Sequence, residues 1–337
     1  MTDATPPQAD HDVVGIGNAI VDVLAPADDA FLATNDIVKG GMTLIDEPRA
    51  ETIYSAMADT VEKSGGSAAN SIACVTSLGG RGAFIGKVAD DALGEAFADD
   101  LHAQGVTFAT PPLTDGPATG RCLISVTPDA QRSMSTFLGA AGRLRLDDID
   151  DALIAGAAIT FFEGYLFEEP NPREAFVKAC LAAKGADRRT ALTLSDAGVV
   201  SRQLDALKRF VPAHVDILLA NQTEAEALFG STDVGAIADA ARALCPLTAV
   251  TRSEHGSVLI QRDGPIVEIE ARAPTALVDT TGAGDAYAAG LLFGLSRGFD
   301  LGRAGALGSL AAAEVISHFG ARPETGLEAL AKDAGLL

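Results

Sequence analysis

The sequence predicts an α/β protein with three layers, in which helices cover both faces of a mostly parallel sheet. Strand-length apolar segments alternate with helix-length segments over roughly 270 residues, an order typical of parallel sheets. Hydrophobic residues make up 47% of the 337-residue chain, which excludes a disordered protein. The length fits about two domains or one large α/β domain. Because no linker or internal repeat divides the chain, we expect one domain over residues 12–325.

In the first half of the chain, two irregular, β-rich stretches interrupt the alternation of strands and helices. Branched apolar residues predict a strand at 12–25, and a glycine pair separates the next two helices. In order, the further elements expected are a helix at 51–63, a helix at 67–78, a strand at 81–88, a helix at 91–104 and a hairpin of strands at 118–126 and 133–138. We expect the stretches at about 18–48 and 118–138 to pair with each other, away from the main sheet.

The second half repeats strand and helix more regularly. Apolar runs bounded by polar residues predict strands at 157–162, 190–194, 216–220, 248–251, 257–261 and 267–270. Longer periodic segments predict helices at 172–184, 201–209, 223–228 and 236–244, and two more that begin at Asp285 and Leu301.

Charge and composition exclude several classes of function. The chain has 25 basic and 46 acidic residues, a net charge of −21, so a nucleic-acid partner is not expected. No apolar run reaches the roughly 18 residues of a membrane span. The polar start, residues 1–11, lacks the basic and apolar parts of a secretory signal and is expected to be a disordered tail.

The cysteines and histidines predict no structural metal site. Cys74, Cys122, Cys180 and Cys245 lie far apart, and no C-x-x-C or H-x-x-x-H pair occurs. We interpret the cysteines as reduced thiols of a cytoplasmic protein.

The sharpest chemical pattern is a glycine-rich turn followed by an acidic residue and a helix. An apolar strand is expected at 276–278, and Gly282, Ala283 and Gly284 lead to Asp285. Free N–H groups at such a helix start bind anions. A carboxylate placed beside a phosphate is explained if it takes the proton of an attacking hydroxyl. The alternative is that Asp285 only interacts favourably with the helix dipole.

Two other helix starts carry polar side chains. Gly65 and Gly66 precede a helix with Asn70 in its first turn, which fits contacts to substrate hydroxyls or simply the tight packing of small residues. Asn221 and Glu224 follow an apolar strand with the spacing of a capping box. The same pair fits placement of a hydrated Mg²⁺, which uses few carboxylates.

Weaker patterns complete the set. The turn from Thr251 to Gly256 is either an ordinary hairpin turn or a nucleotide contact, and Asp22 is either a solvated acid or a contact to a sugar diol. The segment that includes Gly15 and Gly17 lacks the third glycine of a dinucleotide-binding motif.

Taken together, the two glycine-rich segments resemble the signatures of the ribokinase-like (PfkB) carbohydrate and nucleoside kinases. Residues 65–80 are similar to the first signature and residues 279–292 to the second, and the resemblance spans about 12–325. It implies a ribokinase-like fold with a small β-sheet lid, built by the excursions at 18–48 and 118–138. It also implies phosphoryl transfer from Mg-ATP to a hydroxyl group, with no nucleic-acid or membrane partner.

The resemblance also implies roles for residues at matching positions. Asp285 matches the catalytic base, and Gly282, Ala283 and Gly284 match the anion hole. Substrate contacts are implied at Asn18, Asp22, Gly65, Gly66 and Asn70. Contacts to Mg-ATP are implied at Asn221, Glu224, Thr251 and Gly256, and a monovalent cation, usually K⁺, at Asp279, Thr281 and Gly320.

Within the family, the N-terminal segment favours adenosine kinases over ribokinases. Three residues separate Asn18 from Asp22, as is common in adenosine kinases, and Ser67 stands where ribokinases prefer Lys. The acceptor is therefore expected to be the 5′-hydroxyl of adenosine. A sugar kinase acting on ribose, fructose or a related ketose is the alternative, and a nucleoside-binding protein without turnover is a third. A monomer and a homodimer formed through the lid both remain open.

Overall fold

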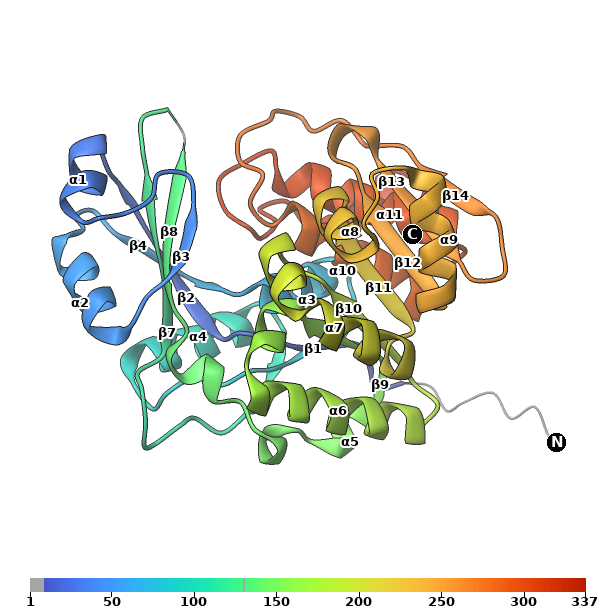
Figure 1. Ribbon diagram of the computed structural model, residues 1–337, viewed down its shortest axis with the longest axis horizontal. Helices are drawn as coiled ribbons and strands as arrows, with labels where there is room; N and C mark the ends of the chain where they lie inside the picture. The colour runs from blue at the N-terminus through green and yellow to red at the C-terminus, as the bar shows by residue number, and fades with distance from the viewer. Residues whose placement is uncertain (1–8, 130) are drawn as a thin grey trace.

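A nine-stranded sheet forms the centre of the protein in the computed structural model, which describes residues 9–129 and 131–337. Figure 1 shows the sheet between two layers of helices, with a second, smaller sheet to one side. The spatial order of its strands is β14-β13-β12-β11-β10-β9-β1-β5-β6. Their bounds are β1 His11–Ile16, β5 Gly82–Ile85, β6 Thr107–Phe108, β9 Ala157–Glu163, β10 Arg189–Thr193, β11 Ile217–Asn221, β12 Leu247–Thr251, β13 Ser257–Gln261 and β14 Ile266–Ile269.

Neighbouring strands from β6 through β12 pair in parallel, and β13 and β14 add antiparallel strands at one edge. Successive residues point to opposite faces of such a sheet. Val13 accordingly belongs to one buried cluster and Val14 to the other. The mostly parallel, doubly covered sheet predicted from the sequence is thus confirmed.

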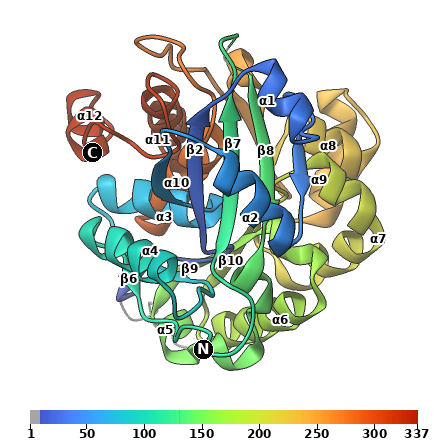
Figure 2. The same cartoon turned by 90° about the vertical axis from the view of Figure 1, so that its left-hand side faces the viewer.

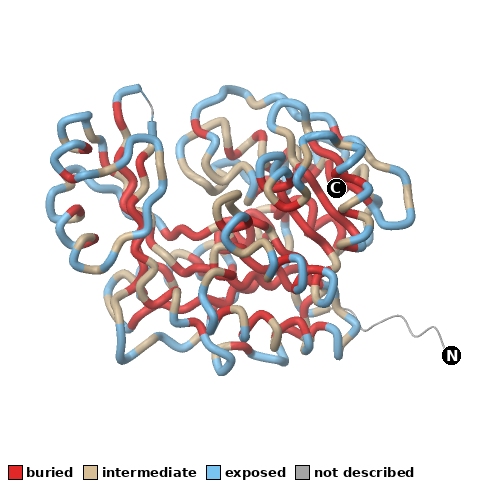
Figure 3. The backbone as a smooth tube through the Cα atoms, in the orientation of Figure 1, coloured by how far each residue is buried: buried red, intermediate tan, exposed pale blue. Residues whose placement is uncertain are grey.

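Helices are divided between the two faces. One cluster takes core residues from α3 Ser67–Ser77, α4 Ala92–Ala103, α10 Ala283–Ser296, α11 Leu301–Val315 and α12 Leu327–Asp333. The other takes them from α5 Asp151–Ala155, α6 Pro170–Gly185, α7 Ala197–His214, α8 Gln222–Phe229 and α9 Val234–Leu244. Figure 3 shows that the buried backbone is concentrated in the central strands and in the helices next to them.

The smaller sheet has five strands in the order β3-β8-β7-β2-β4. Their bounds are β2 Ile20–Pro26, β3 Met42–Leu44, β4 Val61–Gly65, β7 Gly120–Val126 and β8 Arg132–Phe137. β7 and β8 form the expected antiparallel hairpin, and β2 pairs with β7 over seven residues. Helices α1 Asp29–Thr34 and α2 Glu47–Ala56 cover the outer face of this sheet, as Figure 2 shows.

In the first half of the chain, two predicted elements differ from the structure. The strand expected at 12–25 is two strands in different sheets, because the chain turns at 17–19 between β1 and β2. The helix expected at 51–63 begins earlier, at Glu47, and ends at Ala56, after which 61–65 form β4. The exposed residues Val61, Glu62 and Lys63 gave no strand period, yet their backbone pairs with β2. The first excursion therefore extends to residue 65 instead of 48.

The remaining expectations about the chain ends and thiols are partly tested. Residues 1–8 of the expected tail lie outside the described residues, whereas His11 already belongs to β1 and Asp10 donates its N–H to the Gly156 carbonyl at 2.7 Å. All four cysteines are free and buried. Within residues 9–129 and 131–337, no helix combines the length and the apolar character that a membrane crossing requires.

Candidate active site

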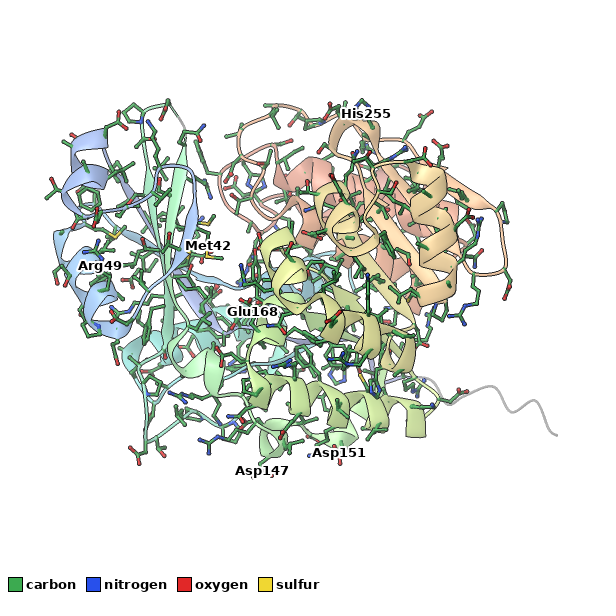
Figure 4. All side chains as sticks on the ribbon, viewed as in Figure 1. Met42, Arg49, Asp147, Asp151, Glu168 and His255 are labelled. Atoms are coloured by element: carbon green, nitrogen blue, oxygen red, sulfur yellow. The ribbon has the colours of Figure 1, made fainter. Side chains whose placement is uncertain are left out.

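A cleft of about 730 Å³ lies between the two sheets. Its floor includes the last residue of each of four adjacent parallel strands, Glu163, Thr193, Asn221 and Thr251. Ligands of α/β sheets bind at these carboxyl ends. The opposite wall comes from the smaller sheet, and Figure 4 labels Met42 on that wall and Glu168 on the main body.

Asp285 lies in the first turn of α10, on the floor of the cleft. The helix begins at Gly282, whose φ of 79° and close packing against Ala321 both require glycine. The first intrahelical bond runs from Ala286 N–H to the Gly282 carbonyl at 2.8 Å. The N–H groups of Gly284 and Asp285 precede that bond and are available to an anion. Ala283, also expected in the anion hole, lines the cleft but directs its N–H to the Thr280 carbonyl at 3.3 Å.

The segment before this helix differs from the prediction. Residues 276–278 form no strand, and Leu277 and Val278 are 72% and 39% exposed. Both side chains line the cleft instead of the core. The apolar sequence of this segment therefore contributes to the cleft rim and not to the main sheet.

Two side chains of α3 donate hydrogen bonds to the Asp285 carboxylate. Ser67 Oγ donates to Oδ1 at 2.6 Å, and Asn70 Nδ2 donates to Oδ2 at 3.2 Å. Burial raises the pKa of Asp285, and these two donors and Arg322 lower it. The helix starts that the sequence singled out near Gly66 and Gly282 are thus in contact.

Gly66 places the start of α3 against the connection between β1 and β2. Its φ is 93°, and a side chain there would overlap the carbonyl oxygen of Asn18. Gly66, Asn18 and Asn70 all line the cleft, as expected. Gly65 is the last residue of β4, pairs with Ile20 and is not among the lining residues.

Glu163 is a buried carboxylate in this region that sequence reasoning missed. It accepts hydrogen bonds from Asn18 Nδ2 at 2.5 Å, from Asn18 N at 3.2 Å and from Ala68 N at 3.0 Å. Burial raises its pKa to about 7. The available signal was its position, one residue beyond the expected strand at 157–162, where a polar residue follows an apolar run.

Asp22 faces the cleft from β2 of the smaller sheet. Burial raises the pKa of its carboxyl to about 6, Arg322 and Arg132 lower it, and Asp285 raises it. Asp22 and Asp285 therefore lie near enough for their charges to interact. The cleft therefore contains two carboxylates, Asp22 and Asp285, that can accept hydrogen bonds from the hydroxyl groups of a substrate.

Asn221 and Glu224 form the capping box at the start of α8. Asn221 N and Nδ2 donate to the two Glu224 carboxylate oxygens at 3.0 and 2.7 Å, and Glu224 N donates to Asn221 Oδ1 at 2.9 Å. Both residues line the cleft, and burial raises the pKa of Glu224 to about 7. The capping and cleft-lining interpretations hold for the same pair.

The donor set fits a hydrated Mg²⁺ held mainly by phosphates better than a protein cage. Within the described residues, no three His, Cys, Asp or Glu side chains are grouped to hold a metal. Both Glu224 oxygens already accept hydrogen bonds. Mg²⁺ in phosphate-transfer sites keeps several waters and uses one or two carboxylates.

Of the two residues expected to contact nucleotide, Thr251 ends β12 and lines the cleft. Gly256 closes the turn before β13 with a φ of 73° and is not among the lining residues.

The loop expected to bind a monovalent cation is already hydrogen-bonded. Asp279 Oδ1 accepts from Thr281 Oγ1 at 2.8 Å, and Oδ2 accepts from Gly320 N at 3.0 Å. Arg132 of β8 forms an ion pair with Asp279 and donates to Thr281 Oγ1 at 2.9 Å. Gly320 donates its N–H to the Asp279 carboxylate, and the Arg132 guanidinium stands beside the same carboxylate. In this arrangement the side chains of the loop pair with one another and with Arg132.

The wall formed by the smaller sheet is largely apolar. It presents side chains from four of its five strands: Ile20, Met42, Leu44, Cys122, Ile124, Val126 and Met134. Tyr165 adds an aromatic side chain from the main body, whereas Leu166 and Phe167, which could have formed a wall for a purine, are buried in the core. The main body thus gives the cleft a polar side, and the smaller sheet gives it a largely apolar side that also carries Asp22, Arg132 and Thr136.

Comparison with known proteins shows which family and which solved structures the chain is similar to. Residues 35–326 match the pfkB family of carbohydrate kinases. Among solved structures, the adenosine kinase from Sinorhizobium meliloti is 46% identical with a TM-score of 0.90, covering 97% of this chain and 100% of that one. A probable sugar kinase protein from Rhizobium etli CFN 42 is 42% identical with a TM-score of 0.92, covering 98% and 100%.

Curated relatives extend the comparison to more distant proteins. Adenosine kinase of Saccharomyces cerevisiae is 28% identical over 331 residues, 91% of this chain and 95% of the relative. Guanosine-inosine kinase of Escherichia coli strain K12 is 29% identical over 241 residues, 66% of this chain. The chain spans 53%, about half, of the length of that relative.

Proposed function

The chain belongs to the pfkB family of carbohydrate kinases, and from this premise we propose that it transfers the γ-phosphoryl group of ATP to the 5′-hydroxyl of adenosine or a related nucleoside. The relatives support the coarser statement, an ATP-dependent kinase of nucleosides or sugars that acts on a hydroxyl group.

The observation that carries the nucleoside assignment is the apolar wall opposite Asp285. A sugar offers hydroxyl groups on almost every side, and burying them against Ile124 and Met134 would leave them without hydrogen bonds. A nucleoside has a polar ribose and a flat, largely apolar base. The base would lie against the apolar part of the smaller sheet. The ribose would lie between Asn70 of α3 and Asp22, a polar residue of β2 in the smaller sheet.

The residues on the floor supply the chemistry of the transfer. Asp285 accepts the proton of the attacking hydroxyl, and Ser67 and Asn70 hold its carboxylate in place. The N–H groups of Gly284 and Asp285 stabilise negative charge on the transferring group. Mg²⁺, when bound with ATP, neutralises phosphate charge, and Glu224 would reach it through water.

A sugar acceptor remains the second candidate, because one solved structure similar to this chain is described as a probable sugar kinase. The buried cluster of Asn18, Glu163 and Ala68 N–H is polar enough to serve a sugar as well as a ribose. The two candidates share the catalytic floor and differ only in what the apolar wall contacts.

Three finer expectations stay predictions. The K⁺ site at Asp279, Thr281 and Gly320 is not part of the proposed mechanism, because those groups already pair with one another and with Arg132. Cytoplasmic location stays a prediction from the cysteines. A monomer and a lid-paired homodimer both stay open, and α1 and α2 occupy the outer face of the smaller sheet (Figure 2).

The experiment is ADP release by the purified protein with Mg-ATP and single acceptors: adenosine, guanosine, inosine, cytidine, ribose and fructose. We expect turnover with adenosine at least tenfold above that with any sugar. Preference for a sugar would overturn the nucleoside assignment but keep the kinase. Binding of adenosine without formation of product would instead support a nucleoside-binding protein. Chromatography identifies the product as the 5′-monophosphate.

A further inference from the structure

Arg322 forms hydrogen bonds both to Asn70, which lines the cleft, and to residues outside the cleft. It lies in the segment between α11 and α12, and its side chain is 14% exposed. Its Nε donates to Asn70 Oδ1 at 3.0 Å, and its Nη1 donates to Asp100 Oδ2 of α4 at 2.8 Å and to Ser64 Oγ of β4. One guanidinium thus joins α3, α4 and β4 at a single point.

The bond from Arg322 fixes which way the Asn70 amide faces. A guanidinium has only donors and an ionised carboxylate has only acceptors. Asn70 lies between the two, so its Oδ1 must face Arg322 and its Nδ2 must face Asp285 Oδ2. The reversed amide would place N–H against N–H on one side and oxygen against oxygen on the other. The second N–H of Nδ2 is then left for a substrate hydroxyl.

The charge of Arg322 acts on the same groups. It lowers the pKa of Asp22 and of Asp285, both of which burial raises. The other titratable or charged groups that face this cluster from neighbouring elements include Cys74 on α3, Asp100 on α4, Arg132 on β8, Glu163 on β9, Tyr165 after β9 and Glu224 on α8. Carboxylates predominate among these groups, so a buried cation offsets their mutual repulsion.

A purely structural role explains this residue less well. Among the described residues, Arg322 Nη2 is buried without a hydrogen-bond partner. Burying a guanidinium with one NH₂ group unpaired costs free energy. A buried ion pair, moreover, is only weak evidence that the residue stabilises the fold. An apolar residue would fill the same space without that cost.

We propose that Arg322 is a positioning residue for phosphoryl transfer, which orients the Asn70 amide so that Asn70 donates to Asp285 and to the acceptor hydroxyl. This inference rests on the proposed function in that it takes Asp285 as the base. It adds a residue that neither signature segment contains, since residues 65–80 and 279–292 both exclude position 322.

The test compares Arg322→Met and Arg322→Lys with Arg121→Met as a matched control. Arg121 is also a buried arginine, pairs with the partly exposed Glu51 and has an unpartnered Nε, but it lies on the smaller sheet and makes no bond to Asp285 or Asn70. For each variant, kcat, KM for ATP, KM for the acceptor and the pH profile of kcat are measured on folded protein.

We expect Arg322→Met to lower kcat at least tenfold while KM for ATP changes less than threefold. The acidic limb of its pH profile should move to higher pH, because removing a positive charge raises the pKa of Asp285. Arg322→Lys keeps the charge but loses the Nε bond, so kcat should fall while the limb stays in place. Arg121→Met should change neither quantity.

The proposal would be overturned if Arg322→Met and Arg121→Met lowered kcat equally and the acidic limb of the pH profile of Arg322→Met did not move. Should the Met variant not fold, Arg322→Lys decides, and an unchanged kcat there overturns it. An inactive Asp285→Asn with a fully active Arg322→Met refutes only the role of Arg322. Wild-type preference for a sugar refutes only the nucleoside acceptor, and the variants are then compared with that sugar.

Discussion

The two walls of the cleft are built by different means and differ in chemistry. The floor comes from the carboxyl ends of β9 to β12 and the starts of α3, α8 and α10, and it carries carboxylates, amides and free N–H groups. The opposite wall comes from the smaller sheet and carries mainly aliphatic and sulfur-containing side chains. The first wall suits chemistry on a phosphate and a hydroxyl. The second suits contact with an apolar surface.

This difference separates reaction from selectivity. Changes on the floor should lower the rate with every acceptor, because the floor carries the groups that we propose act on the reacting atoms. Changes on the apolar wall should alter which acceptor is preferred and how tightly it binds. The predictions below test that separation.

The largest effect is expected at Asp285. Asp285→Asn keeps the size of the side chain but removes the proton acceptor, so kcat should fall by about 10² to 10⁴. KM for ATP and the acceptor should change little. Steady-state ADP release measures both. Asp300→Asn, a matched change at the N-cap of α11, should leave kcat unchanged; near-wild-type turnover by Asp285→Asn would refute its role as base.

The next effect concerns the apolar wall. Met134→Ala removes part of a side chain that lines the cleft from β8, so KM for adenosine should rise about tenfold with kcat nearly constant. Met57→Ala, at the end of α2 and away from the cleft, is the control. A fall in kcat with unchanged KM for adenosine would contradict the division between the walls.

The third effect is a pH dependence of acceptor binding. The pKa of Asp22 is raised to about 6, so below pH 6 its carboxyl takes up a proton and becomes a weaker, uncharged acceptor for a ribose hydroxyl. KM for adenosine should therefore rise by up to about tenfold per pH unit below 6, and Asp22→Asn should abolish that rise. Glu163→Gln tests another carboxyl of the site whose pKa is raised. A pH midpoint that disappears in Glu163→Gln and persists in Asp22→Asn would refute the assignment to Asp22.

The smallest effect is expected from monovalent cations. Because Arg132 already pairs with Asp279, replacing K⁺ by tetramethylammonium at constant ionic strength should change kcat less than about twofold. Activation by K⁺ well above that would restore the cation site expected from the sequence, with Arg132 displaced from Asp279.

The sequence predicted the floor better than the wall, for a physical reason. A strand that ends in a glycine-rich or capped helix start is a local pattern, so Asp285, Asn70 and Glu224 could be identified from their neighbours in the chain. The strands of the smaller sheet owe their state to partners far away. Val61 to Lys63 are exposed and polar on average, and only pairing with β2 makes them a strand.

The residues that sequence reasoning missed follow the same rule. Glu163, Arg132 and Arg322 reach the site through contacts with residues 145, 149 and 252 positions away. No local spacing contains that information. The split of the segment 12–25 was equally hidden, because both halves have the branched apolar composition of a strand and only the sheet assignment separates them.

The connection between β1 and β2 has one more consequence. Only residues 17–19 separate the two strands, and Gly66 alone separates β4 from α3. These two of the four connections between the smaller sheet and the main body meet at Asn18 and Gly66, which both line the cleft. Part of the junction between the two sheets therefore lies within the cleft. A change in the tilt of the smaller sheet would alter the contacts to a bound acceptor. By reciprocity, a bound acceptor would restrict the motion of the smaller sheet.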